Sequence, residues 1–285
     1  MPYLPLRALP TSGNASLATA WLERLEDRLA NPTGDISASR ALLCRETLAE
    51  LMFPAYAANF ETAIADDAVP LATRLALSAL DPRNVCLEPE FYGECDDARF
   101  QPVKPLLWLW YSFDRTPLAG QNVDLGVRFR RLLASRIFNR VGRNFKAFHN
   151  VEFSFGYNME VGDDVVVHRN VLLDDRGGIR LGNGVSISDY ANIYSHTHSI
   201  VEQRDVTNAL TILEDGVRVT YHATVLAGVH VGEQGMVGAN AVATKDVRPY
   251  HVHVGIPAKS VRVKPNAPEP KTVLGTSERV RGPQG

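Results

Sequence analysis

Small aliphatic residues recur along residues 155–257 with a period of about six. The next residue is often glycine or acidic, and a second small residue lies four places after the aliphatic one. A helix has a period of 3.6 and a half-buried strand a period of 2, so a period of six indicates short strands separated by turns. Such hexapeptide repeats predict a parallel β-helix whose coils bury their aliphatic side chains against the coils above and below. The aliphatic series is Val161, Val167, Leu173, Ile179, Leu181, Val185, Ile187, Ile193, Leu213, Val219, Val225, Val231 and Val237.

The repeat lapses once, at about residues 199–212, where polar residues cluster. It resumes after this stretch and ends at about 254–259. An insertion in a repeat protein maps to a loop on one face, and that face is often the binding face. We therefore expect a loop at 199–212, with functional side chains beside it.

Residues before the repeat follow helical spacing instead. The pattern predicts helices at about 14–29 and 37–51, and one or two more within 54–80. Residues 87–92 are predicted as a strand or an extended arm. The most apolar run, 106–111, is predicted as a strand or short helix packed between the two parts of the chain, with a membrane or partner surface as the alternative.

A basic amphipathic helix is predicted at about 124–141. Its apolar side packs on the first coil, and its arginines, Arg130 among them, mostly face away. A surface for nucleic acid or membrane is the alternative. These patterns predict a mainly helical domain at 1–122, a connecting helix at 123–147, a β-helix at 148–264 and a disordered tail at 265–285.

Composition limits the compartment and the partners. A net charge of -2 and a pI of about 6.5 argue against the overall basic field of a nucleic-acid-binding protein. The three cysteines form no CxxC pair and leave an odd one over, which favours reduced thiols. The N-terminal run is a poor signal peptide, and no apolar stretch reaches the roughly 18 residues of a membrane span. We expect a cytoplasmic protein without a membrane span.

The stretch from about residue 131 to 262 resembles the hexapeptide-repeat acyltransferases, especially the maltose and galactoside O-acetyltransferases. The resemblance covers a little under half of the chain and excludes the first 120 residues. It implies a left-handed parallel β-helix, a homotrimer with active sites between subunits, acetyl-CoA as co-substrate and no metal. The handedness comes from the resemblance, since parallel crossovers are normally right-handed. The segments that carry it are FSFGYNMEVGDD, LDD followed by GGIRLGNGVSI, ANIYSHTHS, VLAGVHVG, MVGANAVATKDV and VGIPAK.

Acetyl transfer from a thioester to a hydroxyl requires a base, donors for the developing oxyanion, and two substrates held together. The family pattern Ile-Tyr-x-x-x-His-Pro aligns His198 with the catalytic base, and His196 is the competitor two residues earlier. The resemblance gives the oxyanion donor as the backbone N–H of Tyr221. The chain departs from the pattern at Ser199, where the family has proline, and at 218–220, where it has Trp-Ile-Gly.

The resemblance also implies residues for both substrates. A saccharide-like acceptor is expected at His168, Asn170, Asp175 and His196. Basic side chains suit the phosphates of CoA, and small residues leave room for its pantetheine arm. The corresponding positions are Ser188, Gly238, Ala239, Lys245, Lys259 and Arg262. For the acceptor set and for the two small residues at 238–239, plain turns at the corners of the coils are the alternative.

Three other functions remain open at this point. A serine acetyltransferase also has a helical domain before a β-helix, but its Asp-His-Gly-Thr-Gly motif is absent here. A γ-type carbonic anhydrase would use three histidines on zinc, and the repeat region carries His168, His196, His198, His222 and His230. A trimeric scaffold without catalysis is the third.

Overall fold

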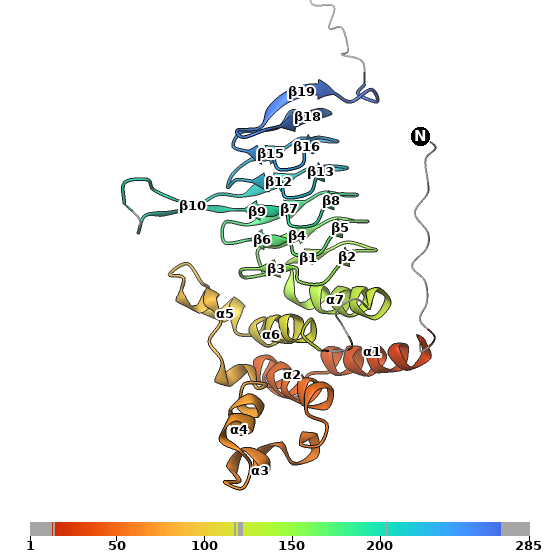
Figure 1. Cartoon of the computed structure of the whole chain (residues 1–285), viewed down its shortest axis with the longest axis vertical. Coiled ribbons are helices and arrows are strands. Elements are labelled where there is room, and N and C mark those ends of the chain that lie inside the picture. Colours follow the sequence, from red (N-terminus) through yellow and green to blue (C-terminus); the bar gives the residue numbers. More distant parts are fainter. Residues whose placement is uncertain (1–12, 14, 117, 119–121, 203, 269–285) are drawn as a thin grey trace, which may run out of the picture.

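The computed structural model describes residues 13, 15–116, 118, 122–202 and 204–268. Its two parts lie one above the other along the long axis of the molecule, with the helices below and a stack of β-coils above (Figure 1). The coils pack on α7, the last helix, and on α6, while α1 to α4 lie farther from the stack.

The helical part begins with two long helices, and its later members are shorter. The Asp35 side chain caps the N-terminus of α2 by accepting a hydrogen bond from the backbone N–H of Ala38. The elements are α1 (Ala15–Ala30), α2 (Ile36–Met52), η1 (Ala57–Asn59), α3 (Phe60–Ala65), α4 (Leu71–Ser78), η2 (Pro82–Asn84), η3 (Glu88–Phe91), α5 (Asp97–Phe100), α6 (Lys104–Phe113) and α7 (Val123–Ile137).

Three stacks of short strands form the sides of the coils, and we name them sheets A, B and C in chain order. Sheet A contains β1 (Arg140–Val141), β4 (Met159–Val161), β7 (Ile179–Leu181), β12 (Thr211–Leu213) and β15 (His230–Val231). Sheet B contains β2 (Lys146–Ala147), β5 (Val166–Val167), β8 (Ser186–Ile187), β13 (Arg218–Val219), β16 (Met236–Val237), β18 (His251–Val254) and β19 (Lys259–Val263). Sheet C contains β3 (Glu152–Phe153), β6 (Leu172–Asp174), β9 (Asn192–Tyr194), β14 (Thr224–Val225) and β17 (Val242–Ala243).

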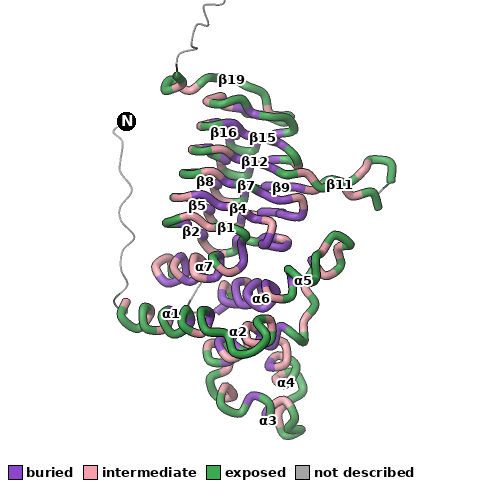
Figure 2. Tube along the Cα trace, turned by 180° about the vertical axis from the view of Figure 1, so that it is seen from behind, coloured by how far each residue is buried: buried purple, intermediate pink, exposed green. Residues whose placement is uncertain are grey.

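All neighbouring strands in these stacks are parallel, except that β19 runs antiparallel to β18. The predicted fold, a parallel β-helix preceded by helices, is therefore confirmed. Every member of the aliphatic series is buried, with at most 1% of its surface exposed. Full burial of such a side chain contributes roughly 1.5–3 kcal/mol. The buried core runs the length of the coils, while the outer helices α3 and α4 are largely exposed (Figure 2).

Coil length varies at one corner only. Arg180 of sheet A lies beside Glu160 in the coil below and Ile212 in the coil above, and Ile212 lies beside His230. Successive coils therefore take 20, 32 and 18 residues. The extra residues all lie between sheet C and sheet A, and we name that turn the loop corner (residues 154–158, 175–178 and 195–210).

The corner between sheets B and C is regular, and we name it the ladder corner (residues 148–151, 168–171, 188–191, 220–223 and 238–241). One residue of each turn has a left-handed backbone with φ between 55° and 61°. Asparagine tolerates this conformation, whereas bulky side chains seldom adopt it. The series is Asn150, Asn170, Tyr190, His222 and Asn240.

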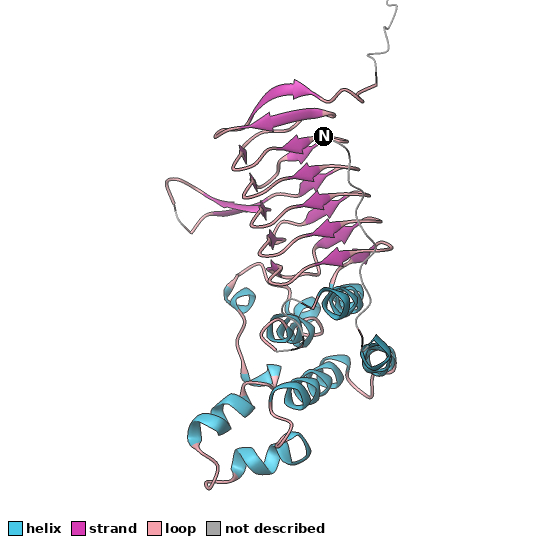
Figure 3. Ribbon diagram, turned by 45° about the vertical axis from the view of Figure 1, so that its right-hand side comes forward, coloured by secondary structure: helices cyan, strands magenta, loops and turns pink. Residues whose placement is uncertain are grey.

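The 32-residue coil projects a hairpin at the loop corner, formed by β10 (His196–His198) and β11 (Val206–Asn208). Figure 3 shows this hairpin standing away from the stack of coils. The loop predicted at 199–212 is confirmed, although residues 211–212 already belong to β12. The two candidate histidines lie on the first strand of the hairpin.

The helical part donates hydrogen bonds to backbone carbonyl groups at the open edge of the first coil. The Trp110 indole N–H donates to Val151 O (2.9 Å), and the Tyr111 hydroxyl donates to Phe153 O (2.6 Å). The run 106–111 thus belongs to a buried helix. This confirms the predicted short helix packed between the two parts of the chain. An uncovered strand edge invites pairing with another chain. In this chain α6 and α7 cover that edge.

Arg130 corrects the predicted solvent face of α7. Its side chain is 2% exposed and pairs with Asp114, which is 4% exposed. Asp114 also accepts a hydrogen bond from the backbone N–H of Asn150 (2.7 Å). A buried guanidinium needs such a carboxylate partner, and no sequence pattern links α7 to the end of α6.

Two further expectations need correction. Residues 88–91 form a single 3₁₀ turn rather than a strand or extended arm. Strands begin at Arg140, inside the range predicted as a connecting helix, because α7 ends at Ile137. Most of the predicted tail, 269–285, lies outside the described residues.

No helix among the described residues is both long enough and apolar enough to span a membrane. The three cysteines are unpaired, with Cys44 buried and Cys86 exposed.

Candidate active site

A cavity of about 890 Å³ lies at the loop corner. Ligand pockets commonly occupy roughly 300–1,000 Å³. Its walls come from sheet C, from the β10–β11 hairpin and from the segment 88–94 of the helical part. The lining residues are Glu88, Phe91, Tyr92, Gly93, Glu94, Ser154, Leu172, Asp174, Arg176, Tyr194, His196, His198, Arg204, Asp205 and Val206.

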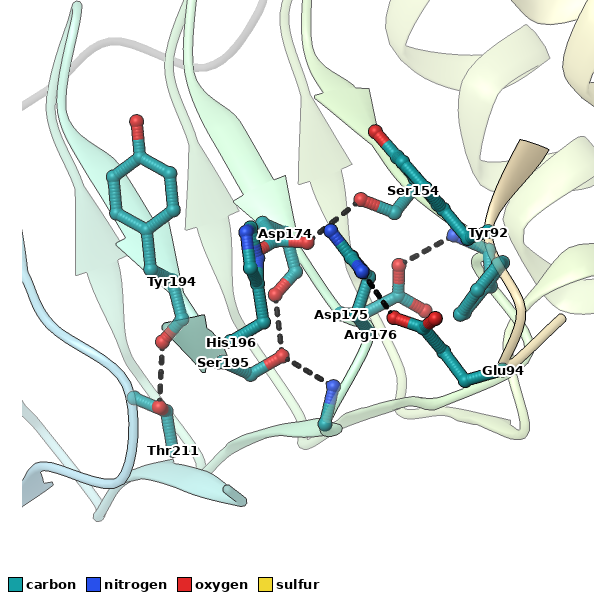
Figure 4. Close-up of polar contacts among 12 residues, drawn as sticks. Tyr92, Glu94, Ser154, Asp174, Asp175, Arg176, Tyr194, Ser195, His196 and Thr211 are labelled. Carbon is teal, nitrogen blue, oxygen red and sulfur yellow. Dashed lines mark hydrogen bonds and ion pairs between the residues drawn. The ribbon is translucent and has the colours of Figure 1, made fainter. Parts of the chain in front are cut away.

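Asp174, His196 and Ser154 form the polar centre of this cavity (Figure 4). The His196 Nδ1 atom lies against one carboxylate oxygen of Asp174. The Ser154 hydroxyl donates to the other oxygen (2.8 Å). The Asp174 side chain is 4% exposed and that of His196 is 19% exposed, so the pair is largely withdrawn from solvent.

The base of the hairpin is held by hydrogen bonds. The buried Ser195 hydroxyl donates to Asp174 O (2.5 Å) and accepts from the backbone N–H of Gly177 (2.8 Å). The Thr211 hydroxyl donates to Tyr194 O (2.6 Å) where the chain rejoins the coils. Gly177 has no room for a side chain, since a Cβ there would lie 2.2 Å from Ser195 O. The start of β10 is therefore fixed on the coil below it.

Asp175 does not line the cavity, which corrects its expected role at the acceptor. It is fully buried and accepts hydrogen bonds from the backbone N–H groups of Phe155 (2.7 Å) and Asn158 (3.2 Å). Burial raises the pKa of Asp175 to about 6, although these backbone donors act in the opposite direction. The carboxylate of Asp175 shapes the turn at 155–158, and its neighbour Asp174 lies at the cavity instead.

The helical part closes one side of the cavity through Arg176. Its guanidinium donates from Nε to Glu94 (2.6 Å) and lies 3.9 Å from the centre of the Tyr92 ring. The Tyr92 hydroxyl donates to Glu88. Burial, and then the bond to Glu88, raise the pKa of Tyr92 to about 12. The wall is thus built from contacts between segments about 80 residues apart.

His198 lines the same cavity from a more exposed position. Its ring centre lies 5.3 Å from that of His196, and the two rings are nearly perpendicular at 86°. Alternate residues of a strand point to one side, which explains why both rings reach the cavity.

Six of the other predicted site residues lie at the ladder corner, across sheet C from His196: His168, Asn170, Ser188, Tyr221, Gly238 and Ala239. In this corner His168, Ser188, Thr220 and Gly238 occupy equivalent positions in successive coils, and the backbone N–H of each donates to the coil above. Asn170, Tyr221 and Ala239 lie in the neighbouring rows of the same turns. His168 stacks on Phe148 with ring centres 5.1 Å apart. The structure therefore separates His168 and Asn170 from His196 within one chain.

Tyr221 has a half-exposed side chain, and its backbone N–H donates to no residue of the described ranges. The amide of Tyr221 therefore has no hydrogen-bond acceptor among the described residues. Lys245, Lys259 and Arg262 are exposed near the last coils, the first after β17 and the other two on β19.

Sequence reasoning did not single out Asp174, Ser154, Tyr92 or Glu94 as functional residues. The Asp174-Asp175-Arg176 run carried a signal, because two acidic residues interrupt the aliphatic repeat just where a coil gains residues. No comparable signal marks Tyr92 or Glu94. In the described ranges no three His, Cys, Asp or Glu side chains converge as a metal site.

Comparison with known proteins relates the chain to acetyltransferases. A putative acetyltransferase of Schizosaccharomyces pombe is 32% identical over 114 residues, which are 39% of this chain and 55% of the relative. The chain thus spans about half the length of that protein. The galactoside O-acetyltransferase of Escherichia coli is 25% identical over 140 residues, 48% of this chain and 69% of the relative. No protein-family model matches the chain.

Solved structures support the fold. A galactoside acetyltransferase in complex with coenzyme A has a TM-score of 0.53 at 22% identity, over 61% of this chain and 85% of that one. A maltose O-acetyltransferase of Clostridium difficile has a TM-score of 0.51 at 21% identity, over 59% of this chain and 87% of that one. These structures confirm the predicted fold, and the two relatives above confirm the predicted resemblance in sequence to acetyltransferases.

Proposed function

We propose that this chain, which is similar to acetyltransferases in sequence and in fold, moves an acetyl group from acetyl-CoA to a hydroxyl of a saccharide-like acceptor. The observation that carries the proposal is the pair of histidines on β10, at a cavity of about 890 Å³ and beside the buried carboxylate of Asp174. The pair lies at the one interruption of the repeat.

In the proposed reaction, an imidazole of β10 removes the proton of the acceptor hydroxyl. The hydroxyl oxygen attacks the thioester carbonyl carbon, and the resulting oxyanion is stabilised by a backbone N–H. The C–S bond then breaks, and the CoA thiolate takes the proton back from the imidazolium. The products are the acetyl ester and CoA. The resemblance assigns the base to His198.

The oxyanion donor comes from a second copy of the chain. Tyr221 lies at the ladder corner and the histidines at the loop corner, on opposite sides of sheet C. One chain therefore does not bring the two groups together. We propose a homotrimer in which the ladder corner of one subunit faces the loop corner of the next.

Acetyl-CoA lies along the ladder corner in this proposal. The small side chains at this corner project little from its surface, which leaves room for an extended pantetheine arm. These residues are Ser188, Gly238 and Ala239. Lys245, Lys259 and Arg262 provide cationic side chains near the end of the coils for the phosphates. A galactoside acetyltransferase with a similar fold has been solved with coenzyme A.

The acceptor occupies the cavity beside the helical part. The aromatic face of Tyr92 and the polar groups of Glu94 and Arg176 form its outer wall. Aromatic rings with nearby charged side chains suit a polyhydroxylated ligand, because the rings pack on C–H groups and the charges bind hydroxyls.

A double variant tests the proposed function. The wild type is assayed for thiol release from acetyl-CoA with a panel of mono- and oligosaccharides and with serine. The His196→Ala/His198→Ala variant should lose about a thousandfold or more in kcat, since it lacks both candidate bases. His230→Ala is the matched control, because His230 also pairs with a carboxylate, Glu214, but on sheet A (2.7 Å). Full activity of the double variant with an accepted substrate would exclude histidine catalysis from β10.

A further inference from the structure

An exposed phenylalanine of the helical part lines the cavity that holds the histidines. Phe91 ends η3 and is 78% exposed, so it lies at the edge of the cavity. It belongs to a part of the chain outside the stretch that resembles the acyltransferases. On the basis of the proposed function, we infer that the Phe91 ring is a platform for a second sugar ring of the acceptor, while the first sugar ring presents its hydroxyl to the histidines of β10. The helical part thereby selects acceptors with at least two sugar rings.

Phe91 differs from the aromatic residues that follow it in the chain. Tyr92 and Phe100 each lie edge-on to the buried Phe155, with ring centres 6.3 Å apart. Tyr157 stacks on Phe155 with ring centres 5.1 Å apart. Among the described residues Phe91 has no ring contact of this kind. Because apolar rings are stabilised by burial, an open ring at the edge of a cavity is available to a ligand.

The turn that carries Phe91 is anchored within the helical part by Glu90. One carboxylate oxygen of Glu90 accepts from the backbone N–H of Leu87 (2.7 Å), and the other accepts from the ammonium group of Lys104 (2.9 Å). The side chains of Glu90 and Lys104 are 19% and 10% exposed, so this ion pair is shielded from solvent and from salt. Glu90 therefore fixes the backbone from which Phe91 projects.

The other side of Phe91 is anchored to the coils. The next residue, Tyr92, has its ring centre 3.9 Å from the guanidinium of Arg176. Arg176 belongs to the loop corner, and it also donates from Nε to Glu94 (2.6 Å). Phe91 thus lies between two fixed neighbours. A platform held in this way binds a ligand with little loss of conformational entropy.

The cavity extends from Phe91 to the polar centre at Asp174 and His196. Its volume of about 890 Å³ is near the upper end of the roughly 300–1,000 Å³ of ligand pockets, so it has room for more than one sugar ring. One face of a pyranose ring consists of C–H groups that pack on an aromatic face, and the hydroxyls at its edge bind charged side chains. Glu88 and Arg204 line the same cavity and provide such side chains. An acceptor of two sugar rings therefore matches both ends of the cavity.

Acceptor length separates the contribution of Phe91 from that of the rest of the cavity. Glucose is compared with maltose, and galactose with lactose. Phe91→Ala should lower kcat/KM for the disaccharides about tenfold, while kcat/KM for the monosaccharides and the KM for acetyl-CoA stay within about twofold of the wild type. Phe91→Trp keeps an aromatic face and should retain the wild-type preference for disaccharides.

Leu71→Ala is the matched control, because Leu71 is 77% exposed on α4 and does not line the cavity. It should leave both kinds of acceptor unaffected. An equal loss for monosaccharides and disaccharides in Phe91→Ala, or no loss for either, would overturn the inference. A wild type that acetylates disaccharides no better than monosaccharides would overturn it as well.

A double-mutant cycle tests whether Glu90 is a positioning residue that acts through Phe91. Glu90→Gln keeps the size of the side chain but removes its charge beside Lys104, and it should lower kcat/KM for disaccharides about threefold. In the Phe91→Ala background the same change should have no further effect on this value, because the platform is already absent. If Glu90 were only structural, Glu90→Gln would lower the stability and leave the preference for disaccharides unchanged.

Direct binding tells failure of the inference from failure of the proposed function. Calorimetry measures the Kd of maltose and lactose for the protein saturated with CoA, which supports no acetyl transfer. If the wild type acetylates no hydroxyl acceptor but Phe91→Ala raises this Kd about tenfold, the proposed function fails and a saccharide site at Phe91 remains. If the wild type is active and Phe91→Ala changes neither the Kd nor kcat/KM for disaccharides, only the inference fails.

Discussion

The two corners that flank sheet C follow opposite rules. At the ladder corner every coil turns in the same way, and one residue per coil repeats the same left-handed backbone. At the loop corner the coil length changes, the polar residues Asp174, Asp175 and Ser195 are buried, and the helical part makes contact through Arg176. The regular corner provides an open surface with a repeating shape, and the irregular corner provides an enclosed set of charged groups.

This difference divides the proposed chemistry between the corners. A repeating surface suits an extended co-substrate such as acetyl-CoA, because equivalent positions line up along it. A base needs a unique environment, and a perfect repeat cannot provide one, since every coil would present the same group. The two corners also explain why the proposed site needs two copies of the chain.

We expect the largest loss of kcat when the backbone N–H of Tyr221 at the ladder corner is removed. Tyr221→Pro lacks the backbone N–H, and it should lower kcat by about a hundredfold to a thousandfold if this amide stabilises the oxyanion. Tyr221→Ala keeps the amide and should stay within a few-fold of the wild type. Steady-state kinetics with circular dichroism measure both variants. Equal kcat in the two folded variants would show that the ladder corner holds no oxyanion donor.

The next effect concerns the close packing of the loop corner. Gly177→Ala would place a Cβ 2.2 Å from Ser195 O, so it should lower the free energy of unfolding by about 3 kcal/mol and disturb β10. Gly184→Ala is the control, because its left-handed φ of +65° is strained but nothing lies within 4 Å of the added atom. It should cost about 1–2 kcal/mol. Chemical denaturation measures the free energy of unfolding of both variants. A larger loss in Gly184→Ala than in Gly177→Ala would mean that the loop corner can rearrange to accept the added atom.

A pH-dependent effect follows from Asp175. Burial raises the pKa of Asp175 to about 6, above its ordinary value of 3.8, so the folded state favours the protonated carboxyl. Its contribution to stability is complete below pH 3.8 and is lost as the pH rises through about 6. The stability difference between wild type and Asp175→Asn should change by about 2–3 kcal/mol across this window. Chemical denaturation at pH 4 and pH 8 measures this difference in the free energy of unfolding. The same difference at both pH values would contradict the raised pKa of Asp175.

The smallest effect tests the open surface of the ladder corner. Ser188→Leu adds a bulky side chain to the corner, and it should raise the KM for acetyl-CoA about tenfold, or roughly 1.4 kcal/mol, without loss of stability. Ser186→Leu places the same side chain two residues earlier on β8 and should leave that KM unchanged. An unaltered KM in Ser188→Leu would place acetyl-CoA elsewhere.

Much of the fold could be predicted because its signal is local. The aliphatic period marked the buried positions of the coils, such as Val167 and Val219, and the lapse in the period marked the hairpin. The helices at 15–30 and 36–52 also followed from spacing. The burial of Arg130 on α7 did not follow from spacing, because its partner Asp114 lies just after the end of α6. Spacing along one helix cannot reveal such a partner.

The repeat, the core and the place of the interruption can be read from the chain alone, because each coil buries its own aliphatic residues at fixed spacing. Which polar groups meet at the interruption depends on how the coils and the helical part pack together. Asp174 reaches His196, 22 residues away, because the extra residues of a coil set how successive corners stack. Glu94 reaches Arg176 because the helical part folds back on the coils. Contacts of this kind depend on the stacking of coils and domains, and they leave no periodic trace in the chain.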